Sequence, residues 1–422
     1  MDSSDDWKLT DPSFFAHGDP REILTRWRQE DPVHWTEGRL ARGFWSITRH
    51  ADAMQVFMNE NRWFSVQRWG ACLPQSPDID DVDKSVFIQL ARSASQIAMM
   101  DGDPHTELRR VFAQRFSPAG VQDLNLLIKR CAREILDDVL QRGECDFVTD
   151  VAGRLPLAVI AAMMDIPKSD WEMLYRWNNM SAAPEDPEWS VGTAEETSSE
   201  GTARLVEYCT RLALERRGRD GEDLLTMLAN ARVDGKLLPD EHLGFNGMMF
   251  FAAGHETTRA SLSAGFLELL RAPDQLRRLK ADIDDVDAVG RAVEECVRWA
   301  SPLTHTLRTA TQDIEIGGVR IREGDWVVPW FISINFDERA FERPDRFDAA
   351  RRANDHLGFA KGKHHCLGIH LARVELRAML QMLIGELGEV ELSGEPEMAA
   401  SNLFWGLKHM PVSFPRSSRK AA

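Results

Sequence analysis

The 422-residue sequence predicts a mainly α-helical protein with a small β-sheet component, and three observations lead to this prediction. Apolar residues recur every three to four positions in several long segments, as in amphipathic helices. Strand-like runs are fewer and short, and they do not alternate regularly with the helices. The composition, with 43% hydrophobic and 28% charged residues, is typical of a globular chain. The length allows two to three domains or one large domain with a sizeable core.

The elements follow from local patterns along the chain. The run Phe-Trp-Ser-Ile-Thr predicts a strand over 44–48. Apolar periodicity predicts helices over 124–140, 201–217, 239–270, 286–300 and 369–387. The helix over 239–270 is apolar around 245–253, so we expect it to be buried on most faces. Strands are expected over 314–321, with a turn at Gly317-Gly318, and over 326–334, whereas 78–83 and 184–200 are expected to be solvated loops.

Charge and cysteine content exclude several classes of protein. The net charge of 51 − 67 = −16 argues against a general nucleic-acid binder, which needs clustered Lys and Arg. The 6 cysteines show no spacing of paired metal ligands or of a disulfide framework. The acidic N-terminus lacks the features of a signal peptide, and the longest apolar stretch, 243–254, is far shorter than the roughly 20 residues of a membrane span. The sequence therefore predicts a cytoplasmic protein with reduced thiols and no membrane anchor.

The segment 359–368, Phe-Ala-Lys-Gly-Lys-His-His-Cys-Leu-Gly, is the densest constellation of chemically active residues. A thiolate at Cys366, just before a helix N-terminus, is stabilised by the helix dipole and by free backbone N–H groups, which suits a metal ligand. Without this setting, a single cysteine is more often a small buried hydrophobe. Zinc bound by His364, His365, Cys366 and His370 is disfavoured, because adjacent ligands chelate zinc poorly.

The polar run 253–258, Ala-Gly-His-Glu-Thr-Thr, interrupts the longest helix. In its ordinary interpretation, a threonine bonds back to the carbonyl four residues earlier and Glu256 is solvated or paired. The functional interpretation is a helix locally opened beside a pocket, where an acid and an alcohol relay protons. The run also begins like a zinc-protease helix, but position 259 is Arg where that motif has its second histidine.

Two further pairs are uninformative in isolation. Glu295 and Arg298 lie one helical turn apart. His105 and Arg109 lie four residues apart on one helical face and form a cationic pair suited to carboxylates, although such a pair is normally just a solvated basic face.

In their order along the chain, these four motifs resemble the cytochrome P450 family of haem-thiolate monooxygenases in its soluble bacterial form. The resemblance covers 11–414 and includes Ser301-Pro-Leu, Arg308-Thr-Ala and Pro344-Asp-Arg-Phe-Asp348. It implies a single-domain cytochrome P450 fold over 1–422, which overrides the estimate from length. About 10 N-terminal and about 7 C-terminal residues are then expected to be flexible.

The resemblance also implies a site for haem b, with Cys366 as the axial ligand of the iron. Phe359 would pack near the sulfur, and backbone N–H groups past the cysteine, as far as Gly368, would tune it. On the opposite side of the haem, Ala253 and Gly254 would leave room for dioxygen, while Glu256 and Thr257 would deliver protons. The positions that match propionate-binding residues are His105, Arg109, Arg308 and His364. Glu295 and Arg298 resemble the structural ion pair of the family, with Arg346 as the expected third member.

The substrate contacts implied by the resemblance are mostly apolar. They favour an apolar small molecule, terpenoid, steroid-like or an intermediate of secondary metabolism. A monomer that receives electrons from a ferredoxin and a ferredoxin reductase is expected, and Lys361, Lys363 and Arg373 form a basic island suited to an acidic ferredoxin. The candidate substrate residues are Met249, Ala252, Thr304, Thr306 and Phe404, together with the segments 66–98, 171–193 and 403–405.

Other functions stay open at this point. A peroxide-driven peroxygenase or an enzyme of oxidative coupling or cyclisation would share the fold, and a non-catalytic haem-binding ligand sensor is the alternative from a different class. The acid–alcohol pair argues against a peroxygenase and against a sensor. Three positions depart from the usual pattern of the family. Ala360 stands where a glycine is usual, Phe336 replaces an arginine, and His255 occupies a variable position and is expected to face solvent or a neighbouring helix.

Overall fold

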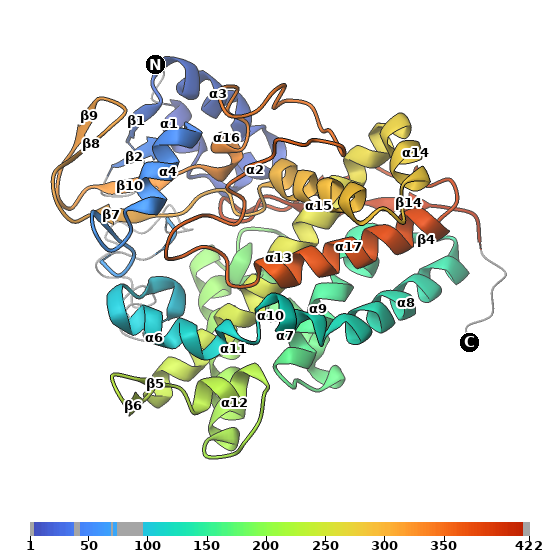
Figure 1. Cartoon of the computed structure of the whole chain (residues 1–422), viewed down its shortest axis with the longest axis horizontal. Coiled ribbons are helices and arrows are strands. Elements are labelled where there is room, and N and C mark those ends of the chain that lie inside the picture. Colours follow the sequence, from blue (N-terminus) through green and yellow to red (C-terminus); the bar gives the residue numbers. More distant parts are fainter. Residues whose placement is uncertain (1–3, 38–42, 69–70, 74–95, 417–422) are drawn as a thin grey trace.

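Helices make up most of the protein, and a small sheet lies to one side of them (Figure 1). The computed structural model describes residues 4–37, 43–68, 71–73 and 96–416. The α-helices are α1 (Ser4–Lys8), α2 (Pro12–His17), α3 (Pro20–Glu30), α4 (His50–Met58), α6 (Gly102–Ala113), α7 (Pro118–Gln122), α8 (Asn125–Arg142), α9 (Arg154–Met163), α10 (Trp171–Ala182), α11 (Ala194–Arg216), α12 (Leu224–Ala229), α13 (Asp240–Arg271), α14 (Pro273–Ala281), α15 (Val286–Ala300), α16 (Phe331–Ile334) and α17 (Ile369–Glu386).

The strands are short and form one five-stranded sheet and several smaller pairings. They are β1 (Val33–Thr36), β2 (Phe44–Ile47), β3 (Phe64–Ser65), β4 (Glu144–Asp146), β5 (Arg232–Val233), β6 (Lys236–Leu237), β7 (Arg308–Ala310), β8 (Ile314–Ile316), β9 (Val319–Ile321), β10 (Trp326–Pro329), β11 (Glu391–Leu392), β12 (Glu397–Met398), β13 (Leu407–His409) and β14 (Pro411–Ser413).

Helix α13 runs through the centre of the helical layer and contacts α9, α11, α15 and α17. Because neighbours surround it, nearly every face is buried, as its apolar composition predicts. Close approach to α15 depends on Gly265, where a Cβ atom would lie 2.1 Å from Sγ of Cys296. The largest hydrophobic core of the protein forms around these helices.

The five-stranded sheet has the order β1-β2-β10-β7-β3, in which only β2 and β10 run parallel. Successive residues of β10 point to opposite faces, so Trp326 joins one core cluster with Trp27 of α3, and Val327 joins another with Phe57 of α4. The sheet therefore has two buried faces. It places β7, with Arg308, next to β3 and the end of α4.

Most predicted elements are confirmed, with two corrections. The segment 326–334 is a strand only to Pro329 and then turns into α16. Helix α11 begins at Ala194, inside the predicted loop 184–200, because Thr193 and Glu196 form a reciprocal capping box. The helix prediction for 286–300 coincides with α15. The predicted loop 78–83 lies outside the described residues, as does most of the C-terminal segment expected to be flexible, whereas residues 4–8 of the N-terminal segment form α1.

Candidate active site

The cysteine segment folds as a tight loop against the end of α4 and leads into α17. The backbone N–H of Cys366 donates to the carbonyl of Phe359 at 2.8 Å. Gly362 has φ +75°, and a Cβ atom there would lie 2.0 Å from the carbonyl oxygen of Phe57, so only glycine fits. Ala360, one of the three departures from the resemblance, also has a positive φ of 53°, at a cost of about 1–2 kcal/mol. The loop places the half-exposed cysteine three residues before α17 begins.

The surroundings of Cys366 suit an anionic sulfur that carries a metal. Loss of solvation raises the pKa of the thiol, while the backbone N–H of Gly368, Arg109 and Arg373 act in the opposite direction. These groups stabilise a thiolate but do not suffice to create one. A coordinated metal ion deprotonates a thiol outright, so the donor set fits ligation to haem iron.

His105 and His364 provide the clearest indication that an anionic group belongs in the site. Their rings stack with centroids 4.1 Å apart. Nδ1 of His105 and Nε2 of His364 are buried and have no hydrogen-bond partner within the described chain. Burial and Arg109 lower the pKa of His105 to about 4, and burial and Arg308 lower that of His364 to about 2. A carboxylate of haem would satisfy both nitrogens and offset the neighbouring positive charges, so these residues fit the propionates.

The two arginines predicted for the propionates already have protein partners. Arg308 is buried and donates to Glu60 from Nε at 2.9 Å and from Nη2 at 2.5 Å. Arg109 donates from Nη2 to the carbonyl of His365 at 2.7 Å. The structure thus brings the four predicted residues to one region and adds Glu60, a carboxylate that no motif indicated.

On α13, the predicted polar turn borders open space at Ala253 and Thr257, whereas its Glu256 is buried among polar side chains. Ala253 is exposed although Phe251 and His255 are buried, so the helix borders open space at this point. Thr257 is half-buried, and its Oγ1 donates to the carbonyl of Ala253 at 3.1 Å. The helix continues without interruption, so the threonine makes the back-bond of the ordinary interpretation and no local opening is seen. Gly254 faces α9, because a Cβ atom there would lie 2.9 Å from side-chain carbons of Ile160, and its predicted role toward dioxygen stays a prediction.

Glu256 is held in a buried polar network. Its Oε1 accepts from Asn178 Nδ2 at 2.8 Å and lies 2.9 Å from His255 Nδ1, and Oε2 pairs with Arg259. Although burial opposes the charge, Arg259 and His255 lower the pKa of Glu256 to about 2. The carboxylate is therefore ionised in this arrangement. His255 is fully buried and contacts the ring of Tyr175 on the neighbouring helix α10.

The structural ion pair on α15 differs in one member from the prediction. Arg298 donates to both oxygens of Glu295 at 2.8 Å, and all of these groups are buried. The third member is Arg351, whose Nε lies 2.9 Å from Glu295 Oε2. The side chain of Arg346 is exposed, and this residue contributes its backbone carbonyl, which accepts from Arg351 at 2.9 Å. The prediction of Arg346 was wrong because spacing along the chain does not reveal which arginine folds inward.

Of the predicted substrate residues, three have apolar side chains and two are threonines whose hydroxyls donate to backbone carbonyls. Met249, Ala252 and Phe404 are half-buried. Thr304 is fully buried and donates to the carbonyl of Asn402, while Thr306 donates to the carbonyl of Ala71 at 2.8 Å. Most of the predicted segment 66–98 lies outside the described residues.

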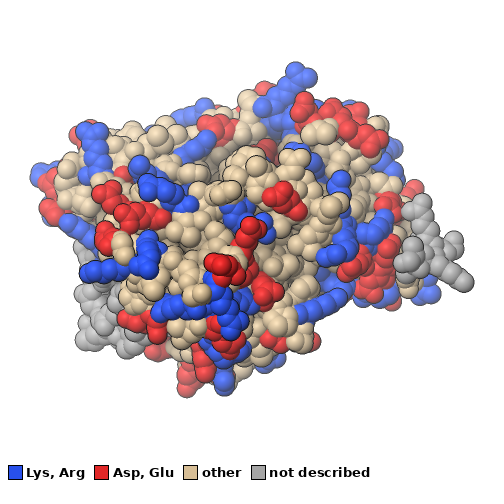
Figure 2. Space-filling model, turned by 60° about the horizontal axis from the view of Figure 1, so that its bottom comes forward, with Lys and Arg blue, Asp and Glu red and all other residues tan. Residues whose placement is uncertain are grey.

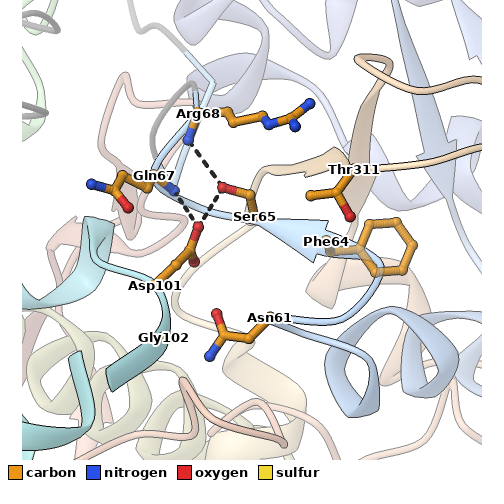
Figure 3. A pocket seen from close by; sticks show the side chains of 8 residues that line it. All are labelled: Asn61, Phe64, Ser65, Gln67, Arg68, Asp101, Gly102 and Thr311. Carbon is orange, nitrogen blue, oxygen red and sulfur yellow. Dashed lines mark hydrogen bonds between the residues drawn. The ribbon is translucent and has the colours of Figure 1, made fainter. Parts of the chain in front are cut away.

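A pocket of about 530 Å³ lies between β3 and the start of α6 (Figure 3). Most of its lining residues are polar in type, and Asp101 accepts from the hydroxyl of Ser65 and from the backbone N–H groups of Val66 and Gln67. Gln67 and Arg68 belong to the predicted substrate segment 66–98, whereas none of the individually predicted site residues lines this pocket. The lining residues are Asn61, Phe64, Ser65, Gln67, Arg68, Asp101, Gly102 and Thr311.

Sequence reasoning missed Glu60, Asn178, Arg259 and Arg351 as members of these networks. Arg259 had a usable signal, because it follows Glu256 by three residues on a helix. The others come from segments without a motif and meet their partners only through the tertiary fold.

Comparisons with known proteins show the family to which this chain is similar. A family model described as cytochrome P450 matches residues 160–397. The chain is 33% identical over 402 residues to the steroid C26-monooxygenase of Mycolicibacterium smegmatis, a match that covers 94% of this chain and 90% of that protein. It is 33% identical over 408 residues to cytochrome P450 NovI of Streptomyces niveus, with 96% and 95% covered.

The fold also matches a solved structure closely. A Mycobacterium marinum cytochrome P450 in complex with pseudoionone superposes with a TM-score of 0.86 at 32% identity, over 96% of this chain and 97% of that chain. Among the described helices, none has the length and apolar content needed to cross a bilayer.

Proposed function

Because the chain belongs to the cytochrome P450 family, whose fold binds haem b through a cysteine thiolate, we propose that it hydroxylates a rigid apolar small molecule of terpenoid or steroid type. The protein is a P450 monooxygenase. Haem, when bound, supplies the activation of dioxygen, in which two external electrons and two protons yield one hydroxyl group on the substrate and one water. The residues of this chain bind the haem, orient the substrate and move protons.

The thiolate of Cys366 would hold the haem iron, and His105 and His364 would be the principal donors to the propionates. Their unpartnered buried nitrogens support this assignment, since two propionates need hydrogen-bond donors in a low-dielectric setting. Arg308 and Arg109 add positive charge beside them.

Proton delivery is assigned to Thr257, whose Oγ1 lies on the open face of α13. Its hydroxyl bonds to the carbonyl of Ala253 at 3.1 Å, and rotation about χ1 would turn the same hydroxyl toward the open space. Glu256, next along the chain, is proposed to exchange protons with the hydroxyl when its pairing with Arg259 loosens. In the described arrangement the carboxylate is ionised and held away by its partners.

The substrate proposal rests mainly on the hydrogen bonds of Thr304 and Thr306, the two threonines that were predicted to contact the substrate. The hydroxyls of Thr304 and Thr306 are buried and donate to backbone carbonyls, so neither has a free hydrogen to donate to a substrate. The remaining predicted contacts, Met249, Ala252 and Phe404, are apolar. A sugar or peptide would need several convergent polar groups. The names of two relatives, a steroid C26-monooxygenase and a structure in complex with pseudoionone, support the same class.

A spectroscopic titration tests the proposal. Apolar terpenoids and steroids should shift the Soret band of the ferric enzyme by displacing water, whereas glycosylated analogues of the same size should not. Tight shifts with the glycosylated compounds alone would exclude the proposed class. Turnover with a ferredoxin, its reductase and NAD(P)H, compared with turnover by hydrogen peroxide, separates the monooxygenase from a peroxygenase. Binding without turnover under both conditions would favour a ligand sensor.

A further inference from the structure

Glu60 is a buried carboxylate that contacts two residues of the proposed haem site, Arg308 and His364. It lies between the end of α4 and the start of β3, and its side chain is 2% exposed. Oε1 accepts from Arg308 Nε at 2.9 Å and from Arg308 Nη2 at 2.5 Å. Oε2 accepts from the backbone N–H of His364 at 3.0 Å. One carboxylate thus connects a strand of the sheet to the cysteine loop.

The contacts leave little freedom for any of these groups. The guanidinium of Arg308 is fixed further by Thr306 Oγ1 at 2.7 Å and by the carbonyl of Leu307 at 2.8 Å. On the loop side, Oε2 of Glu60 would lie 2.9 Å from a Cβ atom at Gly362, so the loop approaches the carboxylate closely. A fork-shaped pairing of arginine with carboxylate fixes orientation as well as distance.

We propose that Glu60 is a positioning residue of the haem site, which orients Arg308 toward the haem propionates, fixes the cysteine loop at His364 and lowers the reduction potential of the haem through its negative charge. This inference rests on the proposed function, because it takes Cys366 as the ligand and Arg308 as a propionate partner.

The charge argument follows from the surroundings. Glu60 interacts electrostatically with Arg109 as well as with Arg308, so it offsets both guanidinium groups. Ferric haem carries one more positive charge than ferrous haem, and a buried negative charge nearby favours the ferric form. A purely structural role would make Glu60 important for folding but would leave the potential unchanged in any variant that still binds haem.

Three variants separate position from charge. Glu60→Gln keeps the size of the side chain and removes the charge. Glu60→Asp keeps the charge and shortens the side chain by one methylene, so it should lose at least one of the two connections. Glu338→Gln is the control outside the haem site, a more exposed carboxylate that likewise pairs with a buried arginine, Arg28.

Two measurements on the haem-loaded proteins read out these effects. The midpoint potential comes from spectroelectrochemistry, and the rate of haem loss comes from transfer to a scavenging apoglobin. Glu60→Gln should shift the potential upward by about 59 mV, which is a tenfold change in the one-electron reduction equilibrium. It should lose haem about 10–100-fold faster, because mutation of residues that hydrogen-bond to metal ligands typically weakens metal affinity by that factor. Glu60→Asp should lose haem faster at a nearly unchanged potential, and Glu338→Gln should match wild type in both.

The Soret band of the ferrous protein with bound carbon monoxide distinguishes failure of this inference from failure of the proposed function. A wild-type Soret band without the red shift of thiolate ligation would overturn the proposed site itself. If wild type and Glu60→Gln both show the red-shifted band of thiolate ligation but share the same potential and the same rate of haem loss, the role of Glu60 is refuted. Should Glu60→Gln fail to fold, Glu60→Asp decides, since a wild-type rate of haem loss in that variant contradicts positioning.

Discussion

Thr257 is the residue at which the chemistry of the enzyme should be most sensitive to a small change. Thr257→Ala removes the hydroxyl at the open face of α13 and leaves the fold and the cysteine loop intact. We expect haem content and substrate affinity near wild type, because among the described residues the hydroxyl bonds only to a carbonyl of its own helix. Product formed per NAD(P)H should fall and peroxide release should rise, since losing a positioned proton-transfer group slows its step by about 10²–10⁴-fold.

The neighbouring alcohol gives a matched control. Thr258 is buried on the same helix, and Thr258→Ala should leave the coupling of electrons to product unchanged. Cys366→Ser should instead remove the thiolate and abolish turnover altogether. Equal coupling in wild type and Thr257→Ala would show that the protons travel by another route.

Arg259 determines the charge state of Glu256. In Arg259→Met, a carboxylate that is 2% exposed loses its ion-pair partner, which should lower the free energy of unfolding by about 3–5 kcal/mol at pH 8. Burial then dominates and raises the pKa of Glu256 above its ordinary value, so the native state binds a proton that the unfolded state does not. The variant should therefore be more stable at pH 5 than at pH 8 relative to wild type.

Urea unfolding at the two pH values measures this difference. The double variant Glu256→Gln/Arg259→Met removes the carboxylate and should recover most of the stability lost at pH 8. A single variant as stable as wild type at pH 8 would mean that His255 and Asn178 suffice to hold the charge.

At the scale of helices and strands, the sequence predicted the long helices well. It did not predict where one element ends and the next begins. Helices α13 and α15 were predicted to within one residue at each end, because α13 is a long, largely apolar segment and α15 repeats apolar residues at helical spacing. The run 326–334 is apolar except for Ser333, and no period separates strand β10 from the turn of α16 that follows it. The network of Glu60 lay beyond prediction for a related reason, because its partners come from β7 and the cysteine loop, far away in sequence.

The crossing of α13 and α15 provides a test of packing between elements. A Cβ atom at Gly265 would lie 2.1 Å from Sγ and 2.6 Å from Cβ of Cys296. Gly265→Ala therefore forces the helices apart and should cost at least about 1–3 kcal/mol, despite the better helix propensity of alanine. The measurement is the midpoint of denaturant unfolding of the haem-loaded protein.

Gly385 of α17 is the matched control for this substitution. It is exposed, and a Cβ atom there meets nothing within 4 Å. Gly385→Ala should be neutral or stabilising by up to about 1 kcal/mol. Similar effects of the two substitutions would contradict the close approach of α13 and α15.

At the scale of the whole molecule, the net charge of −16 is spread over the surface and offset locally. The face shown in Figure 2 carries positive and negative side chains interspersed, without a continuous field of one sign. The basic island predicted near the cysteine is smaller than its sequence indicates. Lys361 pairs with Asp355 at 2.9 Å, and Arg373 pairs with Glu294 at 2.7 Å. Only Lys363, which is exposed, has no ion-pair partner among the residues that the structure describes.

If an acidic ferredoxin docks on the side of the cysteine loop, this difference should govern the rate of electron transfer. Lys363→Glu reverses an uncompensated charge and should slow the reduction of the haem at low ionic strength by up to about tenfold, the lower end of the range for electrostatic steering. Lys361→Glu should have a smaller effect, because its charge is already offset by Asp355.

Stopped-flow reduction by a bacterial ferredoxin, measured across ionic strengths, provides the rates. Lys280→Glu on α14 serves as the exposed control. Since screening removes steering, all four proteins should converge at high salt. Rates that are equal at low salt would place the docking surface elsewhere on the molecule.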